Sequence, residues 1–236
     1  TGFKSAVLNG NDPGGLGGAD QEEVQSIEVG IKRDFADRYR LNASVYYATY
    51  EGIQLNVIDQ DIGGNILIGG PDAEVKGIDL QALARVTDNF QLTFSATALD
   101  AEFTKNNDRF QIKGNKLPGA SDLTVSLVGD LHIPLGNVGD MNFTTTVTHN
   151  DGMYYDHLNY TGSGGTDKDS FDLVNLNLAY TSPDEHWVAS LWANNVFDEE
   201  YYRTGIVAFD TPFGSYGRLG LPGNPRTYGV TLTAKF

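Results

Sequence analysis

The feature that organises this sequence is an alternation of apolar and polar residues with a period of two. In the last nine residues every second position from Tyr228 to Phe236 is apolar, and Gly, Thr and Lys occupy the positions between. This alternation predicts a β-strand with one apolar and one polar face. Helical spacing appears nowhere over a comparable span, so the pattern predicts an all-β protein.

About nine segments carry the same alternation. They are 27–35, 41–47, 78–86, 90–98, 123–131, 141–147, 174–180, 187–193 and 228–236. The series of 41–47 resumes in the same phase at Ile53, Leu55 and Val57, which predicts one very long strand there. The apolar phase carries almost no charge, whereas Asn, Thr, Ser, Gln and a few charged residues occupy the other phase.

The connections between these segments alternate between two kinds. Short, turn-rich connections span 35–39, 86–90, 133–141 and 181–187, and long connections rich in Gly, Asp and Asn span 59–74, 104–116, 154–170 and 203–223. In an antiparallel meander this places all tight turns at one end and all long loops at the other. Transmembrane β-barrels have this asymmetry, and the aromatic residues near the strand ends fit a bilayer's two interfaces.

Composition narrows the function classes. The mean hydropathy is −0.30 and no run approaches the ~20 apolar residues of a membrane helix, a test that barrel strands evade. The net charge of −15 disfavours a nucleic-acid partner. Cysteine is absent, which excludes disulfides and thiolate metal sites. The N-terminal stretch is not a signal peptide, and an odd number of strands predicts that the rest of the barrel wall comes from elsewhere.

Two C-terminal segments carry a family resemblance. "SLWANNVFDEEYY" (190–202) followed by "NPRTYGVTLTAKF" (224–236) is similar to the C-terminal signature of TonB-dependent outer-membrane receptors. Upstream, "SIEVGIKRDFADRYRLNASVYYATYEGIQ" and "AEVKGIDLQALARVTDNFQLTFSATALDAEF" resemble the preceding barrel strands of that family, so the similarity spans nearly the whole chain from Glu22.

The resemblance implies the C-terminal portion, about nine antiparallel strands, of a large transmembrane β-barrel of about 22 strands. We expect residues 1–236 to form this portion, with 1–21 as an extracellular loop, 22–236 as barrel strands and loops, and the plug domain absent from this chain. The implied location is the bacterial outer membrane. The implied partners are the plug and remaining barrel of the same receptor, the TonB complex, membrane lipid and lipopolysaccharide, and a small-molecule or oligomeric ligand. Phe236 would be part of the barrel-assembly signal.

Candidate ligand-binding residues lie in the predicted outer loops. The loop "YYDHLNY" packs aromatics, an acid and a histidine together, and such groups bind ligands by stacking and hydrogen bonding. These candidates are Tyr154, Tyr155, His157 and Tyr160, with Arg109, Phe110 and Arg203 as weaker ones.

A second set has the polar phase and is expected to face the lumen and plug. It comprises Trp192, Lys32, Asp79, Gln81, Arg85 and Asn194. No cofactor, metal ligand or catalytic residue is predicted. The acid pairs Asp59/Asp61 and Asp167/Asp169 do not have EF-hand spacing.

The sequence therefore favours a transport receptor over two alternatives. It would bind a scarce, bulky solute, such as a siderophore, cobalamin or glycan, and import it with energy supplied through TonB. The first alternative is an outer-membrane protease or phospholipase using His149 and Asp151, although no Ser or second carboxylate lies at a recognisable spacing. The second is a soluble β-sandwich binding module.

Overall fold

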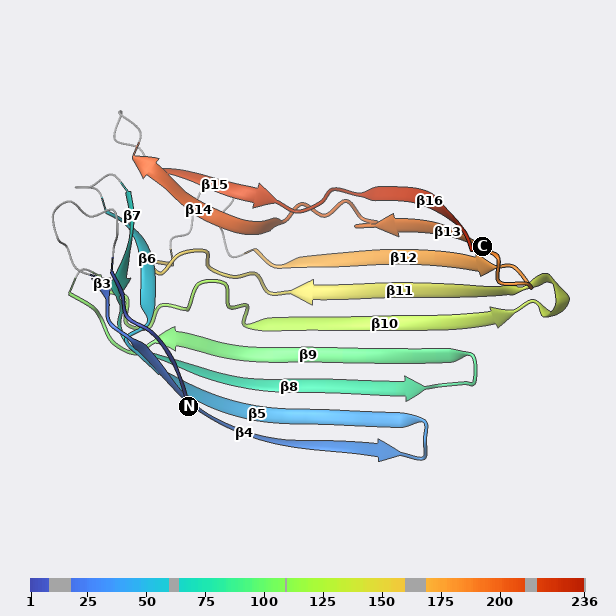
Figure 1. Ribbon diagram of the computed structural model, residues 1–236, viewed down its shortest axis with the longest axis horizontal. Coiled ribbons are helices and arrows are strands. Elements are labelled where there is room, and N and C mark those ends of the chain that lie inside the picture. Colours follow the sequence, from blue (N-terminus) through green and yellow to red (C-terminus); the bar gives the residue numbers. More distant parts are fainter. Residues whose placement is uncertain (9–17, 60–63, 109, 160–168, 211–215, 236) are drawn as a thin grey trace.

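The structure, a computed structural model, describes residues 1–8, 18–59, 64–108, 110–159, 169–210 and 216–235. Its main element is one antiparallel sheet of ten strands. In spatial order these are β1 (Gly2–Lys4), β4 (Glu22–Phe35), β5 (Tyr39–Glu51), β8 (Ala73–Arg85), β9 (Phe90–Phe103), β10 (Leu123–Pro134), β11 (Asp140–Asn150), β12 (Phe171–Thr181), β13 (Trp187–Asn194) and β16 (Thr227–Ala234). Figure 1 shows the strands from β4 to β16 of this sheet lying side by side in this order.

The predicted all-β class and single large sheet are confirmed, and the described part of the sheet has one strand more than expected. The extra strand is β1, which pairs along residues 22–24 of β4. It lies within the segment 1–21, which the sequence predicts to be a loop and which also holds the short hairpin of β2 (Val7–Leu8) and β3 (Gly18–Ala19).

The two kinds of connection lie at opposite ends of the sheet, as predicted (Figure 1). The tight turns join β4 to β5, β8 to β9, β10 to β11 and β12 to β13. In the first of them Ala36 and Asp37 both have positive φ, 49° and 53°, the conformation that lets a short turn follow the twist of the strands. The turn before β11 contains a 3-10 turn, η1 (Gly136–Val138).

Two predicted long loops contain hairpins of their own. β6 (Gln54–Asp59) pairs with β7 (Gly64–Gly69), and β14 (Tyr202–Asp210) pairs with β15 (Tyr216–Pro222). The prediction of one long strand running through Val57 is therefore wrong. β5 ends at Glu51, Gly52 turns the chain at a φ of 65°, and β6 leaves the main sheet. Leu55 and Val57 keep the apolar phase because they are buried in a loop core.

The strand register builds one continuous apolar face. Val29 pairs with Val45, which pairs with Ile78, and the series continues to the last strands, where Leu191 pairs with Val230. These side chains are exposed: 66% for Val29, 54% for Ile78 and 71% for Val230. Within the described residues no second sheet covers this face, which contradicts the β-sandwich alternative.

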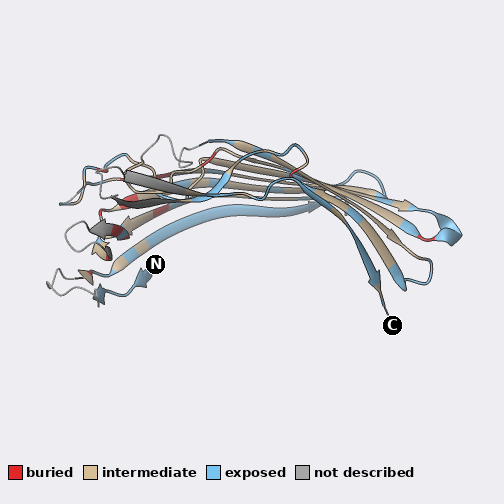
Figure 2. Cartoon of the chain, turned by 90° about the horizontal axis from the view of Figure 1, so that it is seen from above, coloured by how far each residue is buried: buried red, intermediate tan, exposed pale blue. Residues whose placement is uncertain are grey.

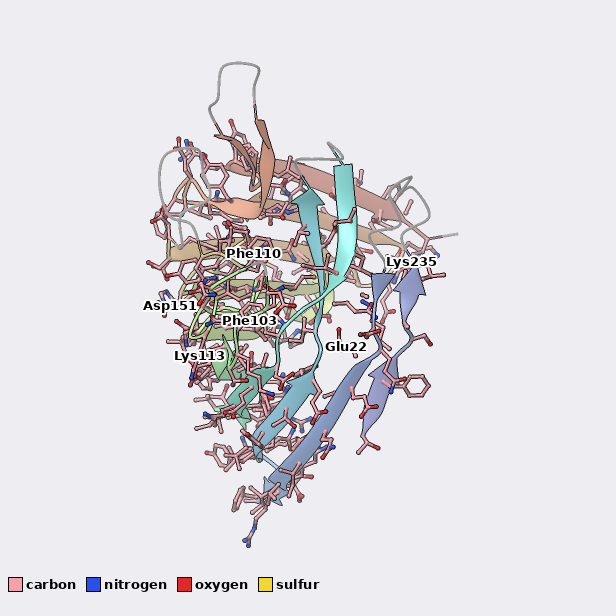
Figure 3. The ribbon with its side chains drawn as sticks, turned by 90° about the vertical axis from the view of Figure 1, so that its left-hand side faces the viewer. Glu22, Phe103, Phe110, Lys113, Asp151 and Lys235 are labelled. Atoms are coloured by element: carbon pink, nitrogen blue, oxygen red, sulfur yellow. The ribbon has the colours of Figure 1, made fainter. Side chains whose placement is uncertain are left out.

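The sheet is a single curved layer (Figures 2 and 3). Viewed from the end with the long connections, the strands follow an arc, and the β6–β7 hairpin lies inside it (Figure 3). No described helix is long and apolar enough to span a membrane.

Candidate functional site

The long connections pack together through a small hydrophobic core at one end of the sheet. Phe103 at the end of β9 and Ile112 in the following loop are almost fully buried, at 1% and 0% exposure. Leu55 and Val57 of β6 pack on them, and Phe110 covers the cluster (Figure 3). Phe103 has the phase of the polar face, so this core sits over that face and holds the loops there.

Hydrogen bonds tie the loop after β9 to the loop after β11. Asn115 Nδ2 donates to the His157 carbonyl at 3.0 Å. Asn159 makes two bonds to the Lys116 backbone: its Oδ1 accepts from the Lys116 amide at 2.6 Å and its Nδ2 donates to the Lys116 carbonyl at 2.9 Å. The two loops are therefore one packed unit.

His157 and Phe110, two of the predicted ligand-binding residues, are brought together by this packing. Their rings meet edge to face with centroids 4.7 Å apart. Burial lowers the pKa of the His157 imidazole, because desolvation disfavours the charged form. Its Nε2 is buried without a hydrogen-bond partner among the described residues.

The other predicted ligand-binding residues are more scattered. Tyr155 donates its hydroxyl to the Tyr202 carbonyl at 3.0 Å, which links its loop to the start of β14. Tyr154 lies in the same loop, and Arg203 is exposed on β14. Arg109 and Tyr160 lie outside the described residues. Ligand binding by this set stays a prediction.

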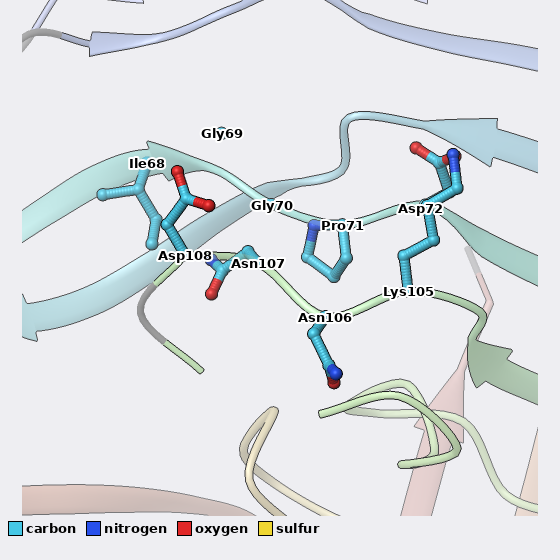
Figure 4. A pocket seen from close by; sticks show the side chains of 9 residues that line it. All are labelled: Ile68, Gly69, Gly70, Pro71, Asp72, Lys105, Asn106, Asn107 and Asp108. Atoms are coloured by element: carbon cyan, nitrogen blue, oxygen red, sulfur yellow. The ribbon is translucent and has the colours of Figure 1, made fainter. Parts of the chain in front are cut away.

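A hollow of about 360 Å³ lies between the β6–β7 hairpin and the loop after β9, at a place that no sequence pattern indicates (Figure 4). Lys105 and Asp72 form an ion pair at 2.5 Å on its lining, and their hydrogen bond raises the pKa of the lysine ammonium. Asn106, Asn107 and Asp108 complete the polar lining, together with a Gly-Gly-Pro turn. The residues meet only because the hairpin folds back over the polar face.

The polar face of the sheet has two differently charged walls. We call the wall of β4, β5 and β8 the charged wall, because its polar phase holds Lys32, Asp34, Arg40, Asp79 and Arg85. The neutral wall comprises β11, β12, β13 and β16, whose polar-phase residues carry no charge apart from Asp140 at the first position of β11.

Predicted lumen-facing residues occupy both walls in the expected phase. On the charged wall, Asp79 accepts a hydrogen bond from Thr97 at 2.6 Å, and Asn42 donates to Gln81 at 3.4 Å. Lys32 pairs in register with Asn42. The other members are Arg85, Asn194 and Trp192.

Each wall contains an aromatic side chain lying over a cross-strand glycine. On the charged wall Tyr46 covers Gly77, where an added Cβ would lie 2.1 Å from the Tyr46 Cζ. On the neutral wall Trp192 covers Gly229, where an added Cβ would lie 2.5 Å from the ring. Glycine is required at both positions because the ring occupies the space of a side chain.

A second hollow, of about 370 Å³, lies beside Trp192 on the neutral wall. Its lining is uncharged and includes Thr146, Asn177, Ser190 and Asn194. The Trp192 Nε1 donates to the Thr231 hydroxyl at 3.2 Å, which fixes the indole against the wall. Of the lining residues, the sequence pattern had singled out Trp192 and Asn194, and the strand register was needed to bring the others to them.

A buried group of hydrogen bonds holds the ends of the loop between β13 and β16, and the alternation of the sequence does not indicate it. Asn195 is 4% exposed, and its Nδ2 donates to the carbonyls of Glu199 and Asn224 at 2.9 and 3.1 Å. Asp198 Oδ1 accepts from the Arg226 amide at 2.8 Å. These bonds bring the two ends of the loop together. They place the start of β16 beside the end of β13 through contacts that do not involve the β14–β15 hairpin.

His149, the histidine of the hydrolase hypothesis, has two carboxylates beside it. His149 has the apolar phase, as predicted, at the loop end of β11. Its Nδ1 is 2.9 Å from Asp172 and its Nε2 is 3.8 Å from Asp151. A serine hydrolase needs a hydroxyl nucleophile at the second ring nitrogen, and among the described contacts His149 has only carboxylates.

The predicted assembly residue Phe236 lies outside the described residues, as do Asp61 and Asp167 of the acid pairs. Within the part of the chain that the structure describes, no group of three or more His, Asp or Glu side chains is placed to hold a metal ion.

The one-sided sheet, its uncovered apolar face and its polar inner face define part of the wall of a large transmembrane β-barrel. A profile of the family described as "TonB dependent receptor-like, beta-barrel" matches residues 1–196. The chain belongs to this family, whose members are outer-membrane proteins of Gram-negative bacteria.

Individual relatives agree with this assignment. The chain is 27% identical over 118 residues to the probable TonB-dependent siderophore receptor PiuA of Acinetobacter baumannii, a match that covers 46% of this chain and 15% of the relative. The solved ferric yersiniabactin uptake receptor FyuA from Yersinia pestis has a TM-score of 0.82 and 18% identity, covering 100% of this chain and 34% of that one.

The solved siderophore receptor PiuA from Acinetobacter baumannii has a TM-score of 0.66 and 20% identity, covering 91% of this chain and 28% of that one. The chain thus spans about a third of the length of these receptors. The relatives are receptors and uptake proteins, which is consistent with the interpretation that the chain is not an enzyme.

Proposed function

We propose that this chain is the C-terminal barrel portion of an active-transport receptor that captures a scarce, bulky solute at its outer loops. Ferric siderophores are the favoured cargo class, because the relatives are named for siderophore binding or uptake. Import would use energy supplied through TonB. The observation that supports the proposal is the loop core, which anchors the long loops over the polar face at one end of the sheet. These loops would form the outer mouth of the barrel.

Capture would use the packed unit of the two outer loops. Phe110 and His157 form its aromatic centre, and the polar hollow beside Lys105 and Asp72 opens next to it. Stacking on aromatic rings and a few fixed polar groups are the usual components of a small-molecule site. Tyr155, Tyr154 and Arg203 would extend the contact surface toward β14.

The remaining parts of the receptor would complete the transport path. A plug would fill the lumen and contact both walls, with a TonB-contacting segment on its periplasmic side. Segment 1–21 would lie at the extracellular mouth, and Phe236 would act in barrel assembly. No nucleic-acid partner is proposed, since the chain carries a net charge of −15.

Membrane lipid would cover the apolar face, and lipopolysaccharide would meet its loop end. At that end Lys76 pairs with Glu74 at 3.0 Å, and Lys116 pairs with Asp100 at 2.6 Å. Charged side chains are tolerated near the interfaces of a barrel and not at its midplane, which agrees with their place beyond the apolar band.

The test is uptake of radiolabelled iron by cells that carry or lack the full-length receptor. Ferric hydroxamate, catecholate and mixed-ligand siderophores, labelled cobalamin and a labelled oligosaccharide serve as probes. We expect one class to accumulate only with the receptor and only while the inner membrane is energised. Accumulation of none of them would overturn the proposal.

Two histidine variants separate loop capture from general damage. His157→Ala is expected to weaken binding of the transported probe several-fold, because it removes the ring that packs on Phe110. His186→Ala changes an exposed tight turn at the opposite end and serves as the matched control. Equal loss in both variants would contradict capture by this loop unit.

A further inference from the structure

The neutral wall contains a site whose chemistry differs from the rest of the polar face. The charged wall offers ammonium, guanidinium and carboxylate groups that can hold a plug by ion pairs. The hollow beside Trp192 offers hydroxyls, amides and one indole, with no charged side chain in its lining. The two walls therefore suit different occupants.

Several lining groups have unused hydrogen-bonding capacity. Thr144 donates its hydroxyl to Asp130 at 2.8 Å, and Trp192 donates to Thr231. For Asn177, Ser190 and Asn194 no side-chain hydrogen bond joins them to another described residue. An unused amide carries two donors and an acceptor, so these groups can bind a polar solute in place of water.

We propose that the hollow beside Trp192 is a solute-contact site on the transport route, and that it takes an uncharged solute rich in hydroxyl or amide groups with a flat face for the indole. This rests on the proposed function. A neutral polar solute trades bonds to water for bonds to Asn177, Ser190 and Asn194 at little net cost. An anion would lose hydration there with no cation in the lining to compensate.

The position of the indole supports contact with a solute. Trp192 is a polar-phase residue of β13. Its indole lies over Gly229 and donates to the Thr231 hydroxyl, so the ring is held against the wall. A ring fixed in this way offers a large contact area at little cost in side-chain entropy. Its partner in register on β12 is Asn177, so stacking and hydrogen bonding are available side by side.

The experiment uses two isosteric serine-to-cysteine variants of the full-length receptor, because this chain contains no cysteine. Ser190→Cys places a thiol in the hollow, and Ser44→Cys places one on the charged wall, opposite Asp79. Any cysteine elsewhere in the receptor is replaced first. Heat-modifiable migration on gels verifies that both variants form barrels. The probes are two membrane-impermeant maleimides, one bearing a neutral polyol and one bearing sulfonates.

Labelling rates are measured in energised and in uncoupled cells, and their ratio at each position cancels the intrinsic reactivity of the thiol. We expect the ratio for the polyol reagent to rise several-fold at Ser190→Cys and to stay near one at Ser44→Cys. The sulfonated reagent should react several-fold more slowly than the polyol one at Ser190→Cys, after correction for their rates with glutathione.

The other outcomes overturn the inference. Protection of the Ser190→Cys thiol in both states would mean that the plug covers the hollow throughout. Equal ratios at the two positions would contradict the placement of the hollow on the transport route. Equal rates for the two reagents would contradict its preference for uncharged solutes. If neither position responds to energy and uptake is also absent, the proposed function itself fails. Energised uptake with a protected hollow rejects only this inference.

Discussion

The two faces of the sheet use the same backbone and place adjacent residues in different solvents. On β16, Leu232 belongs to the apolar face and is 66% exposed, whereas Thr231 accepts a hydrogen bond from Trp192 on the polar face. The apolar face needs only side chains whose polarity is low enough for hydrocarbon. The polar face needs particular partners. On the apolar face, the effect of a substitution on stability should therefore depend on the polarity of the new side chain. On the polar face, it should depend on the shape and the hydrogen bonding of the new side chain.

The strongest way to break this comparison is a charge on each face of β16. Leu232→Arg is expected to cost ~2–4 kcal/mol or to block assembly, because it places a guanidinium in hydrocarbon. Thr231→Arg should lose only the bond from Trp192, worth about 1 kcal/mol, because the new charge lies in a wet lumen. Urea unfolding of the receptor in lipid vesicles measures both. Equal losses would contradict the assignment of faces.

Glycine positions sharpen the comparison, since here the polar face is the less tolerant one. Gly77→Ala puts a Cβ 2.1 Å from the Tyr46 ring and should cost about 1–3 kcal/mol through displacement of that ring. Gly129→Ala on the apolar face meets Thr145 Cγ2 at 3.2 Å, a contact that a small shift relieves. The same vesicle assay compares them. A larger loss for Gly129→Ala would show that ring displacement is not the governing cost.

The faces and the ends of the sheet could be predicted because they follow from short-range pattern. Alternation assigned Val29, Ile78 and Val230 to one face, and loop length assigned the turns to one end. The hollow beside Trp192 could not be predicted, because it requires the register of four strands. For Leu55 the short-range pattern gave a wrong prediction. Its phase matches the lipid face, but the chain turns at Gly52 and Leu55 is buried in the loop core.

Two neighbouring threonines give a finer test on β11. Thr144→Val removes the hydroxyl that donates to Asp130 and should cost about 0.5–1.5 kcal/mol, because the carboxylate loses a partner in the lumen. Thr145→Val changes an apolar-face residue opposite Gly129 and should be neutral or slightly stabilising, since a methyl suits hydrocarbon better than a hydroxyl. Thermal transitions of the two purified receptors in detergent decide the order. A reversed order would place Thr145 in the lumen.

The smallest expected effect is a pH dependence of the loop core, which belongs to neither face of the sheet. Burial lowers the pKa of His157, so the packed loops hold the neutral imidazole and the opened loops take up a proton more readily. A base with a depressed folded pKa contributes stability above its unperturbed pKa of about 6.5 and loses it as pH falls toward the folded value.

Hydrogen exchange of the Lys116 amide, which donates to Asn159, reports this opening. We expect its protection to fall between about pH 6.5 and more acidic values, and His157→Gln to flatten the profile because the titrating group is gone. If the Lys116 amide of His157→Gln showed the same pH profile, the loop core would owe its pH response to another group.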